Sequence, residues 1–202
     1  MQLLQVAWLV ADCVSTLLAM SSEVEPTRVD GKDRMLAKGS AVDGSGHFRQ
    51  TLISGLHFRP TRPVSHEDGS LAEIARTDWA EIDAPIVQVH VTTTQPGRTR
   101  AWGLHEYSTD RLFVVRGLVS IVVFDGRQSS ATYGQVNEFK VSERNPALLV
   151  IPPDLYHGWK VIGTEEAFII NMPTSAYRHD EPDALDLPYE CEDAVAVVPW
   201  RW

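Results

Sequence analysis

From residue 85 onward the chain is a series of short segments rich in β-branched and aromatic residues. The segment Pro85–Thr92 alternates Val87, Val89 and Val91 with polar residues. Further short segments, separated by Gly, Pro, Asn and Asp, are predicted as strands at 99–107, 112–115, 118–124, 136–141, 147–151 and 167–172. Many short strands of period two, with almost no helical period, predict an antiparallel sandwich or barrel. We therefore expect an all-β fold, to which residues 180–188 add a short helical turn.

Composition narrows the class of protein and its partners. The 202 residues are 44% hydrophobic and 22% charged, which is globular composition and enough chain to bury a core without disulfides. The net charge of −9 predicts no nucleic-acid partner, because phosphates would be repelled. The two cysteines, Cys13 and Cys191, lie far apart and lack metal-site spacing, so we expect reduced thiols and a cytoplasmic location.

The first 46 residues differ from the rest of the chain. Residues 1–20 are mostly apolar, but Asp12 interrupts them and no basic residue precedes them. Neither a secretory signal nor a membrane span fits that pattern, so we expect no membrane partner. Residues 21–46 are rich in Ser, Gly, Asp, Glu and Lys without periodicity. We expect a largely flexible extension over 1–46 and one folded domain over 47–202.

Two segments place polar residues among the predicted strands. One runs from Trp102 to Gly117 and the other from Ile151 to Gly158, which contains a Pro-Pro-x-x-x-His sequence. Small barrels enclose either packed side chains or one ligand cavity, and alternate residues of each strand point inward. His105 and Tyr107 have the same parity on a strand predicted over 99–107, so we expect both to line the lumen.

These segments, in this order, resemble the cupin superfamily and, within it, the dTDP-4-dehydrorhamnose 3,5-epimerase family. The resemblance covers residues 51–200 and includes His66–Ile74, which is similar to an early Asp-x-Arg-Gly-x-x-x-Glu element. The other matching segments are Gly103-Leu-His105, Arg111-Leu-Phe113, Ile151-Pro-Pro-x-x-x-His157-Gly158 and Asn171-Met-Pro-Thr-x-x-Tyr177. The resemblance implies a single jelly-roll barrel and a homodimer. It also implies a metal-independent epimerase or keto-isomerase of carbohydrate biosynthesis, acting without a cofactor on a nucleotide-linked or sugar-like ketone.

The resemblance also implies roles for individual residues. His105 takes the place of the base that removes the proton alpha to the sugar ketone, and neutral imidazole suits that task. Arg111 replaces the lysine that stabilises the enolate, and His157 and Tyr177 are expected to orient the ligand. Asn171 stands where the family has a proton-donating tyrosine, although an amide cannot release a proton at neutral pH.

Substrate contacts are expected from four residues, namely Trp102, Tyr107, Asn171 and Arg100. The two arginines with which the family contacts the nucleotide phosphates are replaced here by Asp68 and Trp102. The family aspartate that orients the catalytic histidine has no evident counterpart in this chain. Asp110 or Asp125 is therefore expected to take its place.

Two alternatives use the same residues differently. A metal-dependent cupin enzyme, either a dioxygenase or an isomerase, would bind Fe, Mn or Zn through His105, Asp110 and His157, with Tyr107 standing where such sites have a second histidine. A non-catalytic sugar-binding cupin would bind its ligand without turnover, an interpretation that Asn171 favours. Metal analysis of the protein and a turnover assay would separate these two alternatives from the epimerase.

Overall fold

The computed structural model describes residues 50–202. The extension predicted over 1–46, and Cys13 with it, lies outside the described residues, whereas Cys191 is a free, exposed thiol. The strands are β1 (His57–Pro60), β2 (Val64–His66), β3 (Gly69–Leu71), β4 (His90–Thr94), β5 (Thr99–His105), β6 (Asp110–Arg116), β7 (Val119–Asp125), β8 (Val136–Val141), β9 (Ala147–Ile151), β10 (Leu155–Val161), β11 (Ala167–Asn171) and β12 (Ala184–Asp186). A short helix, α2 (Glu192–Val197), follows them. None of the helices within 50–202 is long and apolar enough to cross a membrane.

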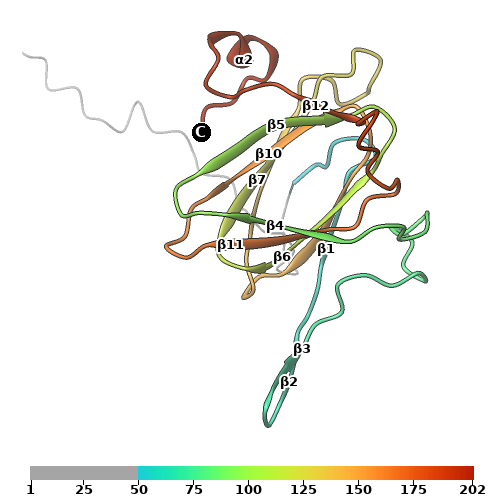
Figure 1. The fold of residues 1–202 in the computed structure, drawn as a ribbon, viewed down its shortest axis with the longest axis vertical. Helices are drawn as coiled ribbons and strands as arrows, with labels where there is room; N and C mark the ends of the chain where they lie inside the picture. Colours follow the sequence, from blue (N-terminus) through green and yellow to red (C-terminus); the bar gives the residue numbers. More distant parts are fainter. Residues whose placement is uncertain (1–49) are drawn as a thin grey trace, which may run out of the picture. The chain divides into compact units, whose positions relative to one another are not determined.

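Two five-stranded antiparallel sheets face each other and form the body of the domain (Figure 1). One sheet has the order β1-β9-β6-β11-β4 and the other has the order β12-β5-β10-β7-β8. The hairpin of β2 and β3 projects away from this body (Figure 1). The arrangement is the predicted all-β jelly roll of the cupin type.

The core lies between the two sheets. Inward-facing residues such as Val119, Ile121 and Val123 of β7 meet Leu149 and Ile151 of β9 there. The outward-facing residues of β7 are buried as well, because the C-terminal segment with α2 covers them. Burial on both faces explains why β7 is a continuous apolar run rather than an alternating one.

Two local predictions were wrong. No helical turn forms within 180–188, because Ala184–Asp186 pairs as β12 with the edge of β5. Backbone hydrogen bonds of this tertiary pairing outweigh a weak local helical preference. The strand predicted over Pro85–Thr92 also starts later, at His90, where pairing with β11 begins. Val87 and Val89, which precede β4, are exposed.

Candidate active site

Side chains of the core do not fill one end of the space between the sheets. A cavity of about 570 Å³ lies there, with β4, β6 and β11 on one side and β5, β10 and β12 on the other. Its polar lining includes His90, Arg100, His105, Asp110, His157, Asn171 and Tyr177. Because inward positions of a small barrel are normally apolar, this concentration of polar groups marks the candidate site.

Two histidines lie side by side on one wall of the cavity. His105 is the last residue of β5, and His157 lies on the neighbouring strand β10, opposite Gly103. Their rings stack with centroids 5.6 Å apart. His157 is buried, whereas the side chain of His105 keeps 23% of its surface exposed. His105 is therefore the more accessible of the two imidazoles.

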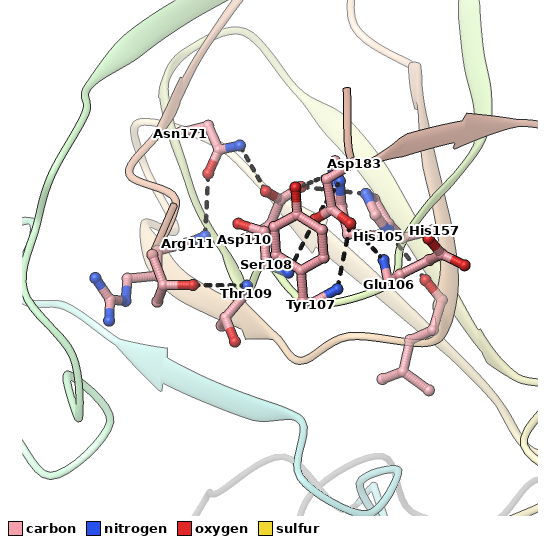
Figure 2. Close-up of polar contacts among 12 residues, drawn as sticks. His105, Glu106, Tyr107, Ser108, Thr109, Asp110, Arg111, His157, Asn171 and Asp183 are labelled. Atoms are coloured by element: carbon pink, nitrogen blue, oxygen red, sulfur yellow. Dashed lines mark hydrogen bonds and ion pairs between the residues drawn. The ribbon is translucent and has the colours of Figure 1, made fainter. Parts of the chain in front are cut away.

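Asp110, the first residue of β6, joins the two histidines from the opposite sheet (Figure 2). Its Oδ2 atom lies 3.3 Å from Nε2 of His105 and 3.2 Å from Nε2 of His157. Its Oδ1 atom accepts a hydrogen bond of 2.8 Å from Nδ2 of Asn171, whose Oδ1 in turn accepts the backbone N–H of Arg111 at 3.1 Å. Asn171 thus holds the Asp110 carboxylate in place.

A second carboxylate, that of Asp183, lies on the other side of the His105 ring. Its Oδ2 is 3.6 Å from Nδ1 of His105, which is longer than a hydrogen bond. The same carboxylate accepts the backbone N–H groups of Glu106 and Ser108, both at 2.9 Å, and that of Tyr107 at 3.3 Å. Asp183 therefore fixes the turn after β5 and places a negative charge beside the imidazole.

The two carboxylates determine the charge preference of His105. Burial opposes a charge on the ring, but the hydrogen bond with Asp110 and the charges of Asp110 and Asp183 outweigh that effect and raise the pKa of His105. Burial likewise opposes the charge of Asp110. Hydrogen bonds and charge from the two histidines outweigh it and hold the pKa of Asp110 far below its usual range.

His157 has a defined tautomer when it is neutral. Its Nδ1 lies 3.0 Å from the carbonyl oxygen of Leu155, which can only accept a hydrogen bond, so Nδ1 carries a hydrogen. The Nε2 atom of neutral His157 then has a lone pair facing Asp110. A proton on Nε2 turns this contact into a charge-assisted hydrogen bond. Nε2 is therefore the atom through which His157 faces Asp110.

Arg111 does not lie in the site, contrary to the prediction that it stabilises an enolate. Successive residues of a strand point to opposite faces, and because Asp110 faces the cavity, Arg111 faces away from it (Figure 2). Its guanidinium is fully buried and donates to the carbonyl oxygens of Ala84 at 2.8 Å and Pro85 at 3.3 Å. The structure assigns Arg111 to anchoring the segment before β4.

Trp102 also lies away from the cavity, which corrects its prediction as a substrate contact. Its side chain is 1% exposed and packs under the C-terminal segment, with its ring centroid 5.0 Å from that of Trp202. Tyr107, expected beside His105 in the lumen, lies instead at the cavity mouth near Tyr177, because β5 ends at His105 and the chain turns. Both tyrosines are half exposed.

The remaining predicted residues lie as follows. Arg100 lines the cavity, and its guanidinium carbon is 5.8 Å from the ring centroid of Trp159. Asp125 does not reach His105, because its carboxylate is buried in a turn and accepts hydrogen bonds from Arg127, Ser130 and Thr132.

Asp183 was not predicted as a residue of the site. It belongs to an acidic run without periodicity, and only its pairing next to β12 brings it to the site.

The residues of the predicted metal alternative also come together. One ligand atom from each of His105, Asp110 and His157 lies within 4.8 Å of the others. Hydrogen bonds hold two of these ligands in place, between His157 and Leu155 and between Asp110 and Asn171, and the Asp183 carboxylate lies 3.6 Å from Nδ1 of His105. Such supporting contacts are typical of metal sites, but they also occur in acid–base sites without metal.

A cupin-type barrel that holds a partly exposed histidine between two carboxylates, at the open end of its cavity, has the features of an acid–base enzyme. Residues 50–191 match the family model described as dTDP-4-dehydrorhamnose 3,5-epimerase. The chain therefore belongs to this family of sugar epimerases.

Two curated proteins are similar to the chain. One, from Haloferax volcanii, is named "Probable low-salt glycan biosynthesis epimerase" and is 32% identical over 139 residues, which cover 68% of this chain and 89% of that protein. The other is a spore coat polysaccharide biosynthesis protein of Bacillus subtilis, 30% identical over 151 residues, which cover 75% of this chain and 97% of that protein.

Solved structures show the same fold. A dTDP sugar isomerase from Desulfovibrio desulfuricans has a TM-score of 0.67 at 23% identity, covering 74% of this chain and 92% of that one. A dTDP-4-dehydrorhamnose 3,5-epimerase from Sulfolobus tokodaii has a TM-score of 0.61 at 22% identity, covering 69% and 81%. The fold predicted from the order of the motifs is confirmed.

Proposed function

We propose that the protein epimerises a nucleotide-linked deoxy-keto-sugar, with His105 removing the proton alpha to the ketone. The observation that carries this proposal is the position of His105 at the cavity, with Asp110 at 3.3 Å from Nε2 and Asp183 at 3.6 Å from Nδ1. Proton abstraction converts neutral imidazole to imidazolium. Two flanking carboxylates favour the imidazolium and so make the histidine a stronger base.

The enolate formed in this step needs a partner for its negative charge. Arg111 is excluded from this role, since its guanidinium points away from the cavity. We assign the role to His157, in which a hydrogen at Nε2 would be shared between Asp110, 3.2 Å away, and the substrate oxygen. A buried, oriented donor stabilises developing charge better than a mobile surface group does.

The rest of the cavity is proposed to bind the nucleotide sugar. Tyr177 and Tyr107 at the mouth offer aromatic surfaces for the sugar or the base. Arg100 is the only lysine or arginine within 50–202 that lines the main cavity, so we assign it to the diphosphate. The family description names dTDP-4-dehydrorhamnose, and a dTDP-linked 4-keto-6-deoxyhexose is accordingly the substrate to test first.

A homodimer is proposed for the assembly. Strand β4 is an edge of its sheet, and Val91 on it, together with Val87 and Val89 just before it, forms an exposed apolar row. Such an edge is suited to pair with a second copy. A cytoplasmic location and the lack of nucleic-acid and membrane partners stay predictions from composition.

A metal-dependent enzyme is the second candidate function, favoured by the convergence of His105, Asp110 and His157. In that case a divalent Fe, Mn or Zn ion would be held by these three ligands, and the ion would polarise the substrate. The two candidates differ in one measurement. The metal-free epimerase keeps its full rate after chelation and dialysis, whereas the metal enzyme loses activity and regains it with one equivalent of ion.

The experiment that tests the proposed function is proton NMR of nucleotide-linked keto-sugars in D₂O with the purified protein. The proposal predicts loss of the signal of the proton alpha to the ketone, together with the appearance of an inverted product. A substrate panel that stabilises the protein thermally but shows no exchange would instead support the non-catalytic sugar-binding alternative and would contradict the proposal.

A further inference from the structure

Inversion of a carbon centre through an enolate needs a proton acceptor on one face and a proton donor on the other. His105 and His157 cannot supply both, because they project from neighbouring strands of one sheet and their rings stack at 5.6 Å. Both therefore approach a ligand from the same side. The donor has to come from the sheet that contains β4, β6 and β11, or from a loop at the mouth.

Strand β4 directs alternate side chains into this space. The Thr94 hydroxyl accepts a hydrogen bond of 3.0 Å from the Trp159 indole across the interior, which fixes the inward face of β4. Residues two and four positions before Thr94 share that face. These are Thr92 and His90, and both line the cavity. His90 thus lies at the open end of the inward row, on the wall opposite His105.

Among the other polar groups of that wall, the Thr92 hydroxyl does not ionise at neutral pH, and the rest are already engaged. Asp110 is held ionised between the two histidines. Asn171 uses its amide nitrogen toward Asp110 and its amide oxygen toward the backbone of Arg111, and an amide is no acid. Asn171 is also the direct cross-strand partner of His90. An acidic group missing at Asn171 is therefore available one strand away, on the same face of the sheet.

Tyr177 is the competing donor from a loop. Its hydroxyl can donate a proton, and both its side chain and that of His90 are exposed, but the Tyr177 ring packs edge-on against His179, with centroids 5.0 Å apart. Its backbone N–H is bound to the side chain of Gln88 at 2.7 Å. These contacts place Tyr177 at the rim of the cavity, whereas His90 belongs to a regular strand of the wall.

We infer that His90 is the general acid that protonates the enolate on the face opposite His105. The inference rests on the proposed function. In the first step the C–H bond alpha to the ketone breaks, His105 takes the proton, and the electron pair moves to the carbonyl oxygen. In the second step the electron pair returns, a C–H bond forms with the proton of a His90 imidazolium, and neutral His90 remains. Solvent then returns a proton to His90 and takes one from His105.

The test compares two signals from the same NMR assay in D₂O, which are exchange of the alpha proton with retention and formation of the inverted epimer. We expect His90→Gln to slow inversion by about 10²-fold while exchange with retention keeps the wild-type rate, because His105 still removes and returns a proton on its own face. His90→Tyr restores an acid at this position and should recover inversion. His57→Gln, a change of an exposed histidine outside the cavity, serves as the matched control and should behave as wild type.

The inference is overturned if His90→Gln inverts the substrate at the wild-type rate. It is also overturned if Tyr177→Phe abolishes inversion while exchange continues, since Tyr177 would then be the donor. Parallel loss of exchange and inversion in His90→Gln overturns it as well, since His90 would then bind the substrate rather than protonate it. A wild-type protein without any exchange would refute the proposed function itself. That result can be told apart from the others because it is obtained with the wild-type protein, before any variant of His90 is tested.

Discussion

A histidine that takes a proton from carbon must be neutral when the substrate binds and cationic afterwards. The carboxylates beside His105 favour the cationic state. They therefore increase the driving force for proton transfer from carbon, but they also narrow the pH range in which His105 is neutral and can act as a base. Asp183 has no other charged partner within 50–202. Its effect on His105 can therefore be measured separately from the effects of Asp110, which also contacts His157.

Asp183→Asn is predicted to shift the pH profile. Loss of the charge lowers the pKa of His105, so the acid limb of kcat/KM should move to lower pH, while the maximal rate falls because the base is weaker. Asparagine keeps one acceptor oxygen, which can serve the N–H groups of Glu106 and Tyr107, and loses the acceptor of the Ser108 N–H. If the acid limb of kcat/KM stayed at the same pH and only the maximal rate fell, Asp183 would act by fixing the turn after β5 and not through its charge.

Asp110→Asn is predicted to destabilise the fold in a pH-dependent way. The lowered pKa of Asp110 contributes stability above its unfolded value, and this is lost as pH falls through the folded pKa. The raised pKa of His105 contributes stability below its unfolded value, and this is lost as pH rises through the folded pKa. Both contributions overlap at about pH 5.

We therefore expect Asp110→Asn to lower the free energy of unfolding by about 3 kcal/mol at about pH 5 and by clearly less at about pH 9. Urea unfolding at the two pH values measures this difference. An equal loss at both pH values would show that the charge of His105 adds no pH-dependent stability through Asp110.

At the scale of elements, the site depends on the close pairing of β5 and β10, which carry the two histidines. Their register shifts between His157 and Trp159, next to Gly158. A Cβ atom at Gly158 would lie 2.9 Å from both the Cα of Ala101 and the carbonyl oxygen of Arg100. Real Cβ atoms do not approach backbone so closely, so only glycine fits there without moving β5.

Gly158→Ala is therefore predicted to push β5 away from β10 and to displace His105 relative to His157. We expect a loss of about 1–3 kcal/mol in unfolding free energy and a larger proportional loss of kcat than of substrate affinity. Gly69→Ala on the exposed hairpin is the matched control, since a Cβ atom there meets nothing within 4 Å. If the folded Gly158→Ala protein had the wild-type kcat, the site would not depend on the close pairing of β5 and β10.

The sequence patterns predicted most strands because period two and turn residues are local properties. They did not predict β12, whose three residues are strand only because the edge of β5 accepts them. They also could not say which face of β6 is inward. Period two places Asp110 and Arg111 on opposite faces, and only packing of residues 83–85 over Arg111 decides which of them meets the cavity.

At the scale of the whole molecule, the exposed apolar row at β4 predicts that two copies associate. A lysine at Val91, which is 57% exposed, would place a charge at the edge and oppose pairing. Val91→Lys is expected to convert a dimer to a monomer in sedimentation, with the control Ile162→Lys, also an exposed apolar position, remaining dimeric. A dimeric Val91→Lys protein would show that the interface lies elsewhere.

Motif order predicted the fold, and four of the residues that it singled out, His105, Asp110, His157 and Asn171, lie together in the candidate site. Asp183 escaped prediction for a physical reason, since its contact with His105 spans 78 positions of the chain and leaves no local pattern. Arg111 and Trp102 were misplaced because matching a motif fixes a position in the chain but not the direction of its side chain.

The most direct test of the central claim is deuterium exchange by His105→Ala. The substrate is a dTDP-linked 4-keto-6-deoxyhexose in D₂O, and proton NMR follows the position alpha to the ketone while a thermal melt confirms that the barrel is folded. We predict that the folded variant loses exchange by at least about 10²-fold relative to wild type. Exchange at the wild-type rate in folded His105→Ala would remove His105 from the chemistry and contradict the account.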